Sequence, residues 1–225
     1  MQNTISFQGE LGSYSHQACL EIFPEHQIKP CPTFESAIDS VNKGYTELAM
    51  LPVENSTYGR VADIHSLLPS SGLNIVKEHF LRVHIHLLAL RGSKLSDIRK
   101  AVSHTVLLGQ CQKFLNANKI ESVVGPDTAG SAKEIASKKD PSIGALASSL
   151  AAEIYGLESL AADIEDMTNN TTRFLVMSSR ERLNSEKIKE NQCMTTLVFQ
   201  VRNIPAALYK ALGGFATNGI NMLKL

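Results

Sequence analysis

Apolar and polar positions along the chain follow two rhythms, one typical of buried strands and the other of helices that cover a sheet. The helical rhythm is clearest after Thr33, where apolar residues recur at intervals of three and four as far as Gly44. Residues 47–55, ELAMLPVEN, instead form a nearly continuous apolar run, which is typical of a buried strand. Thr33 can cap the helix and Gly44 can end it.

Strand-like and helix-like segments follow each other in turn over the first 178 residues. This repeated β-α-β order predicts parallel sheets with helices on both faces. The expected strands are 4–7, 47–55, 101–103, 121–125, 142–147 and 173–178, together with a long β-rich stretch at 73–90. The expected helices begin near residue 14 and then cover 33–44, 60–68, 96–100, 105–117, 128–138 and 148–155.

Beyond residue 178 the pattern changes. Residues 179–193 are polar and charged, and we expect them to be a linker. A strand-like segment at 194–201, a helix-like segment at 204–219 and a closing strand at 220–225 then predict a small third β-α-β unit.

The charge balance narrows the classes of function. Lysine plus arginine equals aspartate plus glutamate, 22 of each. A neutral chain lacks the excess of cations that offsets phosphate charge, so we do not expect a nucleic-acid partner. The longest apolar runs are too short to cross a membrane and the start is not that of a secretion signal, so we expect a cytoplasmic protein without a membrane partner.

The cysteines fit the same interpretation. Cys19, Cys31, Cys111 and Cys193 are widely spaced and form no close pair. We therefore expect reduced thiols rather than disulfides or a zinc site.

Three polar clusters lie where an expected strand ends or begins. Ligands of open α/β sheets bind beyond the carboxyl ends of strands, so these clusters are candidate site residues. Each cluster taken alone is better explained as an ordinary turn. The glycine pair in the first cluster lacks the full dinucleotide-binding pattern, so a nucleotide site is not favoured. The clusters are 9–15, 54–57 and 168–174.

Five motifs taken together resemble the prephenate dehydratase family, in that family's order. They are GELGSYSHQA (9–18), LPVENSTYGRV (51–61), SH…GQC (103–111), DTAGSA (127–132) and NNTTRF (169–174), and the tail from residue 203 resembles the start of an ACT regulatory domain. The resemblance implies an α/β fold of two doubly wound lobes similar to type-II periplasmic binding proteins, plus a partial ferredoxin-like ACT unit. It implies conversion of prephenate to phenylpyruvate, water and carbon dioxide in phenylalanine biosynthesis, without a metal or organic cofactor.

On this resemblance the catalytic domain covers residues 1–178. One lobe would consist of about 1–75 and 165–178, and the other of about 76–164. Residues 179–193 would be the linker and 194–225 the partial ACT domain.

The resemblance also assigns roles. Thr172 would donate a hydrogen bond to the departing ring hydroxyl, helped by Asn169 or Ser13. Arg173 would bind the side-chain carboxylate, because a strong ion pair on the ring carboxylate would stabilise the ground state and slow decarboxylation. We expect Glu54 to support its neighbours. The expected substrate-binding residues are Gly12, Tyr14, Glu54, Asn55, Ser56, Thr57, Asn170, Thr171, Phe174 and His104.

Two histidine positions stay open. His104 follows a strand where family members often read SHPQAL, but here Thr105 and Val106 replace the proline and glutamine. A plain loop histidine is as good an interpretation as a functional one. His84 and His86 fall on one face of an expected strand and could bind a metal, but no third ligand is evident in the sequence, so structural roles are favoured.

The tail predicts altered regulation. Ala206, Ala207 and Leu208 stand where the family has a Gly-Ala-Leu step, and an added methyl group there would hinder an effector that approaches the backbone closely. The tail supplies half of an ACT module. We therefore expect a weakened phenylalanine effector, and a homodimer or homotetramer that covers the exposed sheet edge.

Other interpretations remain. Arogenate dehydratases share these motifs and act on a substrate with an amino group. A non-catalytic small-ligand-binding protein would share the two-lobe fold, since fold does not fix function. An amino-acid sensor would work through the ACT-like tail.

Overall fold

The computed structural model describes residues 3–179, 195, 197 and 199–223. It divides into two compact units, Met1–Leu183 and Asn184–Leu225. The first unit holds two lobes, each built on its own sheet.

The described part of the first lobe is a six-stranded sheet with the order β2-β1-β3-β11-β5, and β4 pairs with β3. Strands β2, β1 and β3 are parallel to one another, whereas β11 is antiparallel to both β3 and β5. The strands are β1 (Thr4–Gln8), β2 (Gln27–Cys31), β3 (Leu48–Asn55), β4 (Gly59–Arg60), β5 (Asn74–Arg82) and β11 (Thr171–Ser178).

Helices cover both faces of this sheet. On one face α1 (Tyr14–Ile22) packs its Ala18 and Cys19 against Phe174 and Val176 of β11. On the other face α2 (Phe34–Asn42) and α3 (Ala62–Leu67), which continues into η1 (Leu68–Ser70), pack against the other side of β3 and β11. Thr33 caps α2, as predicted.

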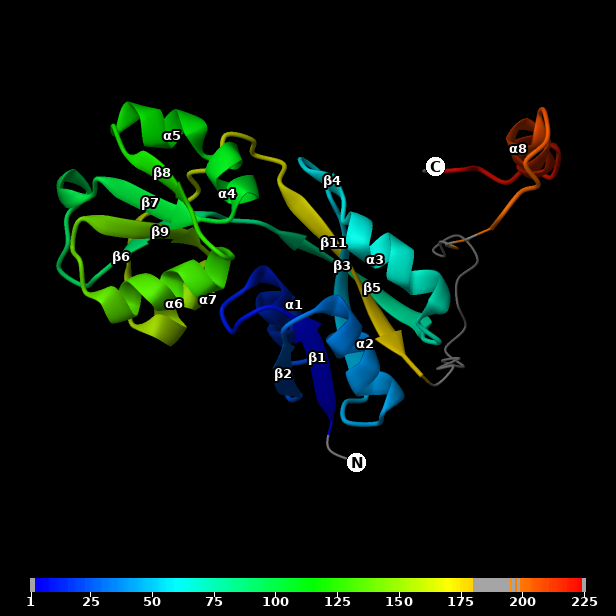
Figure 1. The fold of residues 1–225 in the computed structure, drawn as a ribbon, viewed down its shortest axis with the longest axis horizontal. Coiled ribbons are helices and arrows are strands. Elements are labelled where there is room, and N and C mark those ends of the chain that lie inside the picture. Colours follow the sequence, from blue (N-terminus) through cyan, green and yellow to red (C-terminus); the bar gives the residue numbers. More distant parts are fainter. Residues whose placement is uncertain (1–2, 180–194, 196, 198, 224–225) are drawn as a thin grey trace. The chain divides into compact units, whose positions relative to one another are not determined.

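The second lobe has a five-stranded sheet in the described residues, in the order β10-β6-β9-β7-β8 (Figure 1). Strands β9, β7 and β8 are parallel, and β6 is antiparallel to β9 and β10. The strands are β6 (His86–Ala89), β7 (Lys100–Ser103), β8 (Glu121–Val124), β9 (Ile143–Ala147) and β10 (Glu158–Ala161). The helices are α4 (Thr105–Gln110), α5 (Gln112–Ala117), α6 (Thr128–Lys138) and α7 (Ser149–Tyr155), with the 3-10 turn η2 (Leu95–Asp97).

The two-lobed α/β fold class is confirmed, with several differences in detail. The long β-rich stretch is two strands, and β5 belongs to the first sheet because it pairs along its length with β11. The crossing between lobes therefore falls at residues 83–85 rather than near residue 76. Both sheets are mixed rather than parallel. The expected helix at 96–100 is only the turn η2, and the one at 105–117 breaks at Cys111.

In the second unit the structure contains the helix α8 (Ala207–Thr217). The strands expected at 194–201 and 220–225 are not formed at the residues of those segments that the structure describes. Residues 180–193 of the predicted linker lie outside the described residues. The ACT assignment therefore stays a prediction.

Two expectations about the whole chain can be compared with the structure. Cys19, Cys31 and Cys111 are free and buried, whereas Cys193 lies outside the described residues. None of the described helices combines the length and the apolar character that crossing a bilayer requires.

Candidate active site at the junction of the two lobes

The polar residues singled out in the sequence lie at the carboxyl ends of parallel strands. In the first lobe, β1 leads into the loop 9–13 and β3 ends at Asn55. Strand β11 runs in the opposite direction, so its first residues, Thr171 and Thr172, lie at this same edge. Such an edge is where open α/β sheets bind ligands.

Asn55 is the centre of a hydrogen-bond network at this edge. Its Oδ1 accepts from the Thr57 backbone N–H at 3.0 Å, from Thr57 Oγ1 at 2.7 Å and from the Tyr58 N–H at 2.9 Å. Its Nδ2 donates to Asn170 Oδ1 at 2.7 Å and to Thr172 Oγ1 at 3.0 Å. An amide with all these partners has its orientation fixed.

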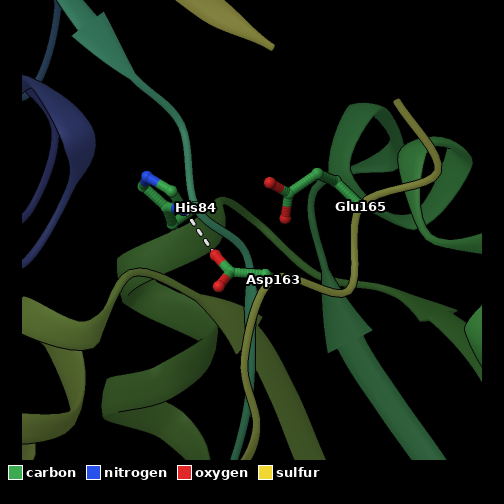
Figure 2. Close-up of side chains that lie close together, drawn as sticks. All are labelled: His84, Asp163 and Glu165. Atoms are coloured by element: carbon green, nitrogen blue, oxygen red, sulfur yellow. Dashed lines mark hydrogen bonds and ion pairs between the residues drawn. The ribbon is translucent and has the colours of Figure 1, made fainter. Parts of the chain in front are cut away.

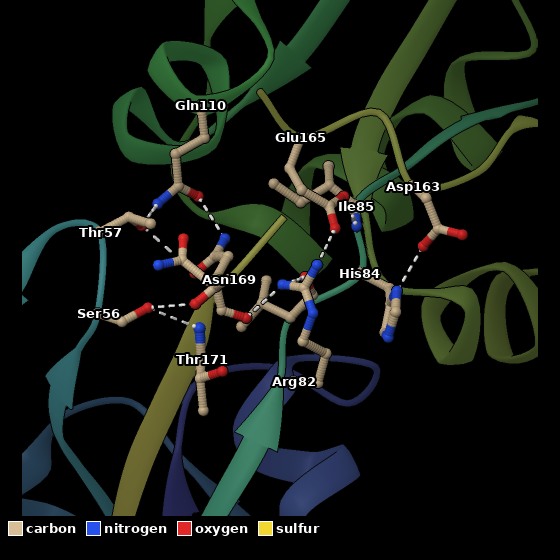
Figure 3. A network of polar contacts seen from close by, with 12 residues as sticks. Ser56, Thr57, Arg82, His84, Ile85, Gln110, Asp163, Glu165, Asn169 and Thr171 are labelled. Carbon is tan, nitrogen blue, oxygen red and sulfur yellow. Dashed lines mark hydrogen bonds and ion pairs between the residues drawn. The ribbon is translucent and has the colours of Figure 1, made fainter. Parts of the chain in front are cut away.

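The network is closed by a residue of the other lobe. Gln110, at the end of α4, donates from Nε2 to Thr57 Oγ1 at 2.5 Å, and its Oε1 accepts from Asn170 Nδ2 at 3.0 Å. Figure 3 shows Gln110 extending from the second lobe toward Thr57. Asn170 is almost fully buried, with 1% of its surface exposed. Gln110, Thr57, Asn55 and Asn170 thus form a ring of hydrogen bonds that joins the lobes.

The ring determines what the Thr172 hydroxyl can do. The Asn55 amide NH₂ is only a donor, so Thr172 Oγ1 must accept from it. The hydroxyl proton of Thr172 then points elsewhere and is available to a ligand. Thr172 also lies on the α1 face of the sheet, because Phe174, two residues further along the same strand, packs on α1.

An ion pair supports the site where the chain crosses between lobes. Arg82, the last residue of β5, donates to the carbonyl of Asn170 at 2.6 Å and to Glu165 Oε1 at 3.0 Å. Glu165 Oε2 accepts from the Ile85 N–H at 3.0 Å, and its side chain is only 3% exposed (Figure 3). Hydrogen bonds to Glu165 and Asn170 therefore connect the crossing segment 83–85 and Arg82 before it with the other crossing segment, 162–170.

His84, Asp163 and Glu165 lie close enough together to be considered as metal ligands (Figure 2). The His84 ring bonds to Asp163 through Nδ1, and both Glu165 oxygens are already bonded, one of them to a guanidinium. A divalent cation would have to displace these partners beside a positive charge, so the cluster is better explained as a hydrogen-bonded crossing point.

Comparison with known proteins agrees with this geometry. The model of the prephenate dehydratase family matches residues 5–182. The chain belongs to the prephenate dehydratase family.

Several relatives with named activities are similar to this chain. The chain is 47% identical over 227 residues to a bifunctional N-acyl-homoserine lactone acylase/prephenate dehydratase of Komagataeibacter europaeus, covering 100% of this chain and 79% of the relative. It is 38% identical to arogenate dehydratase/prephenate dehydratase 1 of Arabidopsis thaliana, covering 98% of this chain but only 56% of the relative. The crystal structure of prephenate dehydratase in complex with L-Phe from Arthrobacter aurescens is similar with a TM-score of 0.82 and 26% identity, over 98% of this chain and 74% of that one.

Two residues expected in the dehydratase site lie elsewhere. Arg173 falls on the face opposite Thr172, because the next residues on its side, Leu175 and Met177, pack with α2 and α3. Its Nε donates to Glu78 Oε2 at 2.9 Å, so the expected role as a carboxylate ligand is not supported by this geometry. Phe174 is 1% exposed and belongs to the core beside α1, where it cannot touch a substrate at the edge of the sheet.

Ser56 has a structural role at the edge of the network. Its Oγ donates to the Asn169 carbonyl at 2.6 Å and accepts from the Thr171 N–H at 2.9 Å, as Figure 3 shows. It clamps the turn that precedes Thr172. The Asn169 side chain itself is exposed, and no contact in the structure connects it with Thr172.

The first cluster is divided between local and interlobe roles. Ser13 caps α1, its Oγ accepting from the His16 N–H at 3.3 Å. Tyr14 donates to the carbonyl of His84 in the crossing segment at 2.9 Å. Burial raises the pKa of Tyr14 well above its usual value, with Cys111 and Glu165 adding to the effect, so its hydroxyl stays protonated as a donor.

The remaining predicted residues have supporting positions. Glu54 lies opposite Arg173 in the ladder between β3 and β11, on the face away from Thr172. His104 is exposed and caps α4, its Nδ1 accepting from the Val106 N–H at 3.3 Å. This capping contact fits the plain structural interpretation of His104 that the sequence left open.

Arg82, Glu165 and Gln110 were outside the predicted site. The motif SH…GQC contained Gln110, but nothing local indicated that its amide crosses to the other lobe. At the regulatory position Ala206 adopts φ +60°, a left-handed conformation that favours glycine. Leu208 is 47% exposed at the start of α8.

Proposed function

We propose that this protein catalyses the decarboxylating dehydration of prephenate to phenylpyruvate. Family membership supports a lyase of this kind. The observation that carries the proposal is the hydrogen bond from Asn55 Nδ2 to Thr172 Oγ1, since it leaves the threonine proton free for the departing oxygen of the substrate.

The reaction breaks two bonds of the substrate ring. The bond to the ring carboxylate breaks and carbon dioxide leaves, while its electron pair stays in the ring. The bond to the ring hydroxyl breaks, and this oxygen takes up one proton and leaves as water. Thr172 donates a hydrogen bond to this oxygen and transfers its proton as the bond to the ring breaks. The threonine then recovers a proton from solvent. The product is aromatic, so the protein needs to assist only the departure of water.

The side-chain carboxylate of prephenate needs a partner other than Arg173. We assign it to the N-terminus of α1, which lies on the same face of the sheet as Thr172. Ser13 Oγ accepts from His16, so its own proton can be donated, and the first N–H groups of a helix bind anions. Arg173, on the opposite face, then does not hold the ring carboxylate in its ground state, where a strong ion pair would slow its loss.

Arogenate is the second candidate substrate, because the Arabidopsis relative is named for both activities. Arogenate differs in carrying an ammonium group on the side chain. The name of the Komagataeibacter relative adds N-acyl-homoserine lactone acylase, and the identity of 47% makes this a third activity to measure. Purified protein given each substrate separately distinguishes these activities by their products, phenylpyruvate, phenylalanine or free homoserine lactone.

The test of the mechanism is Thr172→Ala. We expect turnover of prephenate to fall by about 10²–10⁴-fold, the usual contribution of acid–base assistance, with a modest change in KM. Thr172→Ser should keep part of the rate because it keeps the hydroxyl. Thr33→Ala is the matched control, since it removes a threonine hydroxyl that caps α2 and should cost about 1 kcal/mol of stability without slowing turnover. Normal turnover by Thr172→Ala would refute the mechanism.

A further inference from the structure

A loop of the first lobe, residues 9–13, contacts the second lobe through three consecutive residues. Glu10 Oε2 lies 3.0 Å from Lys133 Nζ on α6. The carbonyl of Leu11 accepts from Tyr155 at 2.7 Å, and the carbonyl of Gly12 accepts from Ser148 Oγ at 2.6 Å. We call residues 9–13 the docking loop.

The docking loop also fits closely against α7. Gly12 is buried and has φ +88°, a conformation that favours glycine. A Cβ atom added at this position would lie 2.9 Å from Cα of Ala151, closer than two carbon atoms can approach without moving the backbone. The contact is therefore a built interface and not a chance meeting of two surface side chains.

These contacts are distinct from the covalent crossings between the lobes. The chain crosses at 83–85 and 162–170, next to β5 and β11, whereas the docking loop follows β1. The loop leads directly into Ser13, the cap of α1. Any movement of the second lobe away from the loop would change the surroundings of the helix N-terminus to which we assigned the substrate carboxylate.

The three contacts differ in strength. The Lys133–Glu10 pair is 59% and 45% exposed, so water and salt weaken it. Ser148 also caps α7, accepting from the Ala151 N–H at 3.1 Å, so its removal would disturb the helix itself. Tyr155 is partly buried against the core of the second lobe, and its hydroxyl bonds to the docking loop.

We propose that Tyr155 is a positioning residue that holds the docking loop on the second lobe and so keeps the two lobes in the arrangement that binds substrate. The expected change in KM rests on the proposed dehydratase function. The contact between the docking loop and the second lobe can be measured without any substrate.

The test is Tyr155→Phe, which keeps the ring and removes only the hydroxyl. One neutral hydrogen bond changes an equilibrium about fivefold. If the docked arrangement is the one that binds substrate, KM for prephenate should rise by up to about fivefold while kcat stays within about twofold. Tyr45→Phe is the matched control, since Tyr45 is 66% exposed in the first lobe, and it should change neither constant.

Hydrogen–deuterium exchange of the ligand-free protein provides the second measurement. In Tyr155→Phe we expect faster exchange in a peptide that contains the docking loop, residues 9–13, as well as in α7. Faster exchange confined to α7 would mean that Tyr155 only stabilises its own helix, and this would overturn the proposal. So would an unchanged KM. Wild-type protein without dehydratase activity would refute the proposed function, while the exchange result would still decide whether the loop is held by Tyr155.

Discussion

Replacing Asn55 by aspartate should reverse the hydrogen bond on which the proposed chemistry depends. The two side chains have the same shape, so the oxygen that accepts from Thr57 and Tyr58 keeps its bonds. The second carboxylate oxygen replaces Nδ2 and cannot donate to Thr172 Oγ1 or to Asn170 Oδ1. The Thr172 hydroxyl then donates its own proton to the aspartate and has none to offer the substrate.

The expected losses of turnover and of folding stability differ enough to distinguish an effect on catalysis from an effect on folding. Two donated hydrogen bonds are lost, each worth about 1 kcal/mol, and the reversed threonine restores one of them. The free energy of unfolding should therefore fall by about 1–2 kcal/mol, which leaves most domains of this size folded. Turnover should fall by about 10²–10⁴-fold, as it does when the Thr172 hydroxyl is removed.

The assay is the formation of phenylpyruvate from prephenate by the two single variants and the double variant, with circular dichroism to confirm folding. Both changes make the same Thr172 proton unavailable to the substrate. Turnover by the double variant, Asn55→Asp with Thr172→Ala, should therefore be within about threefold of turnover by Thr172→Ala alone. Losses that multiply in the double variant would refute the reasoning, since Asn55 would then act on the substrate independently of Thr172. More than a tenth of wild-type turnover in Asn55→Asp would refute it as well.

Two further predictions concern stability and regulation. Glu165→Gln should lower the free energy of unfolding by about 1.5–3 kcal/mol in urea titrations, because it removes the charge opposite Arg82. Asp39→Asn removes an exposed ion pair with Lys43 and should lower it by less than about 0.5 kcal/mol. Equal losses in the two variants would contradict the structural role of the ion pair at the crossing between lobes. Ala206→Gly should relieve the left-handed backbone at the start of α8 and strengthen phenylalanine binding in calorimetry relative to the wild type, and an unchanged or weaker binding heat would show that Ala206 does not limit the effector site.

Strands β1, β3, β9 and β11 could be predicted because each contains an apolar run that its own residues define. Strand β3 is a clear case, since its continuous apolar pattern reflects burial between helices on both faces. The lobe boundary could not be predicted in the same way. Residues 73–90 contain no glycine or proline that would separate β5 from β6, and only the pairing of β5 with β11, far along the chain, shows where the crossing falls.

The candidate site was predicted in part for a related reason. Asn55, Thr57, Asn170 and Thr172 share one network, as their positions near strand ends suggested. A motif of adjacent residues in a strand cannot point as a whole to one face, because side chains alternate. The alternation alone places Arg173 on the face opposite Thr172, where it bonds to Glu78. The pairing of Arg82 with Glu165 depends on the tertiary fold and had no local signal.

The ring and the docking loop attach the second lobe at two separate places, through Gln110 on α4 and through Ser148 and Tyr155 on α7. Both helices begin at the carboxyl end of a strand of the second sheet. In the first sheet the docking loop follows β1, and Asn55 is the last residue of β3. Separation of the lobes would break both attachments. Thr57 would then lose its donor from Gln110, and Asn170 would lose its acceptor, so the amide of Asn55 would be held less firmly. The orientation of the Thr172 hydroxyl thus depends on both attachments together, which would couple enclosure of the substrate to the proton donation that we propose for Thr172.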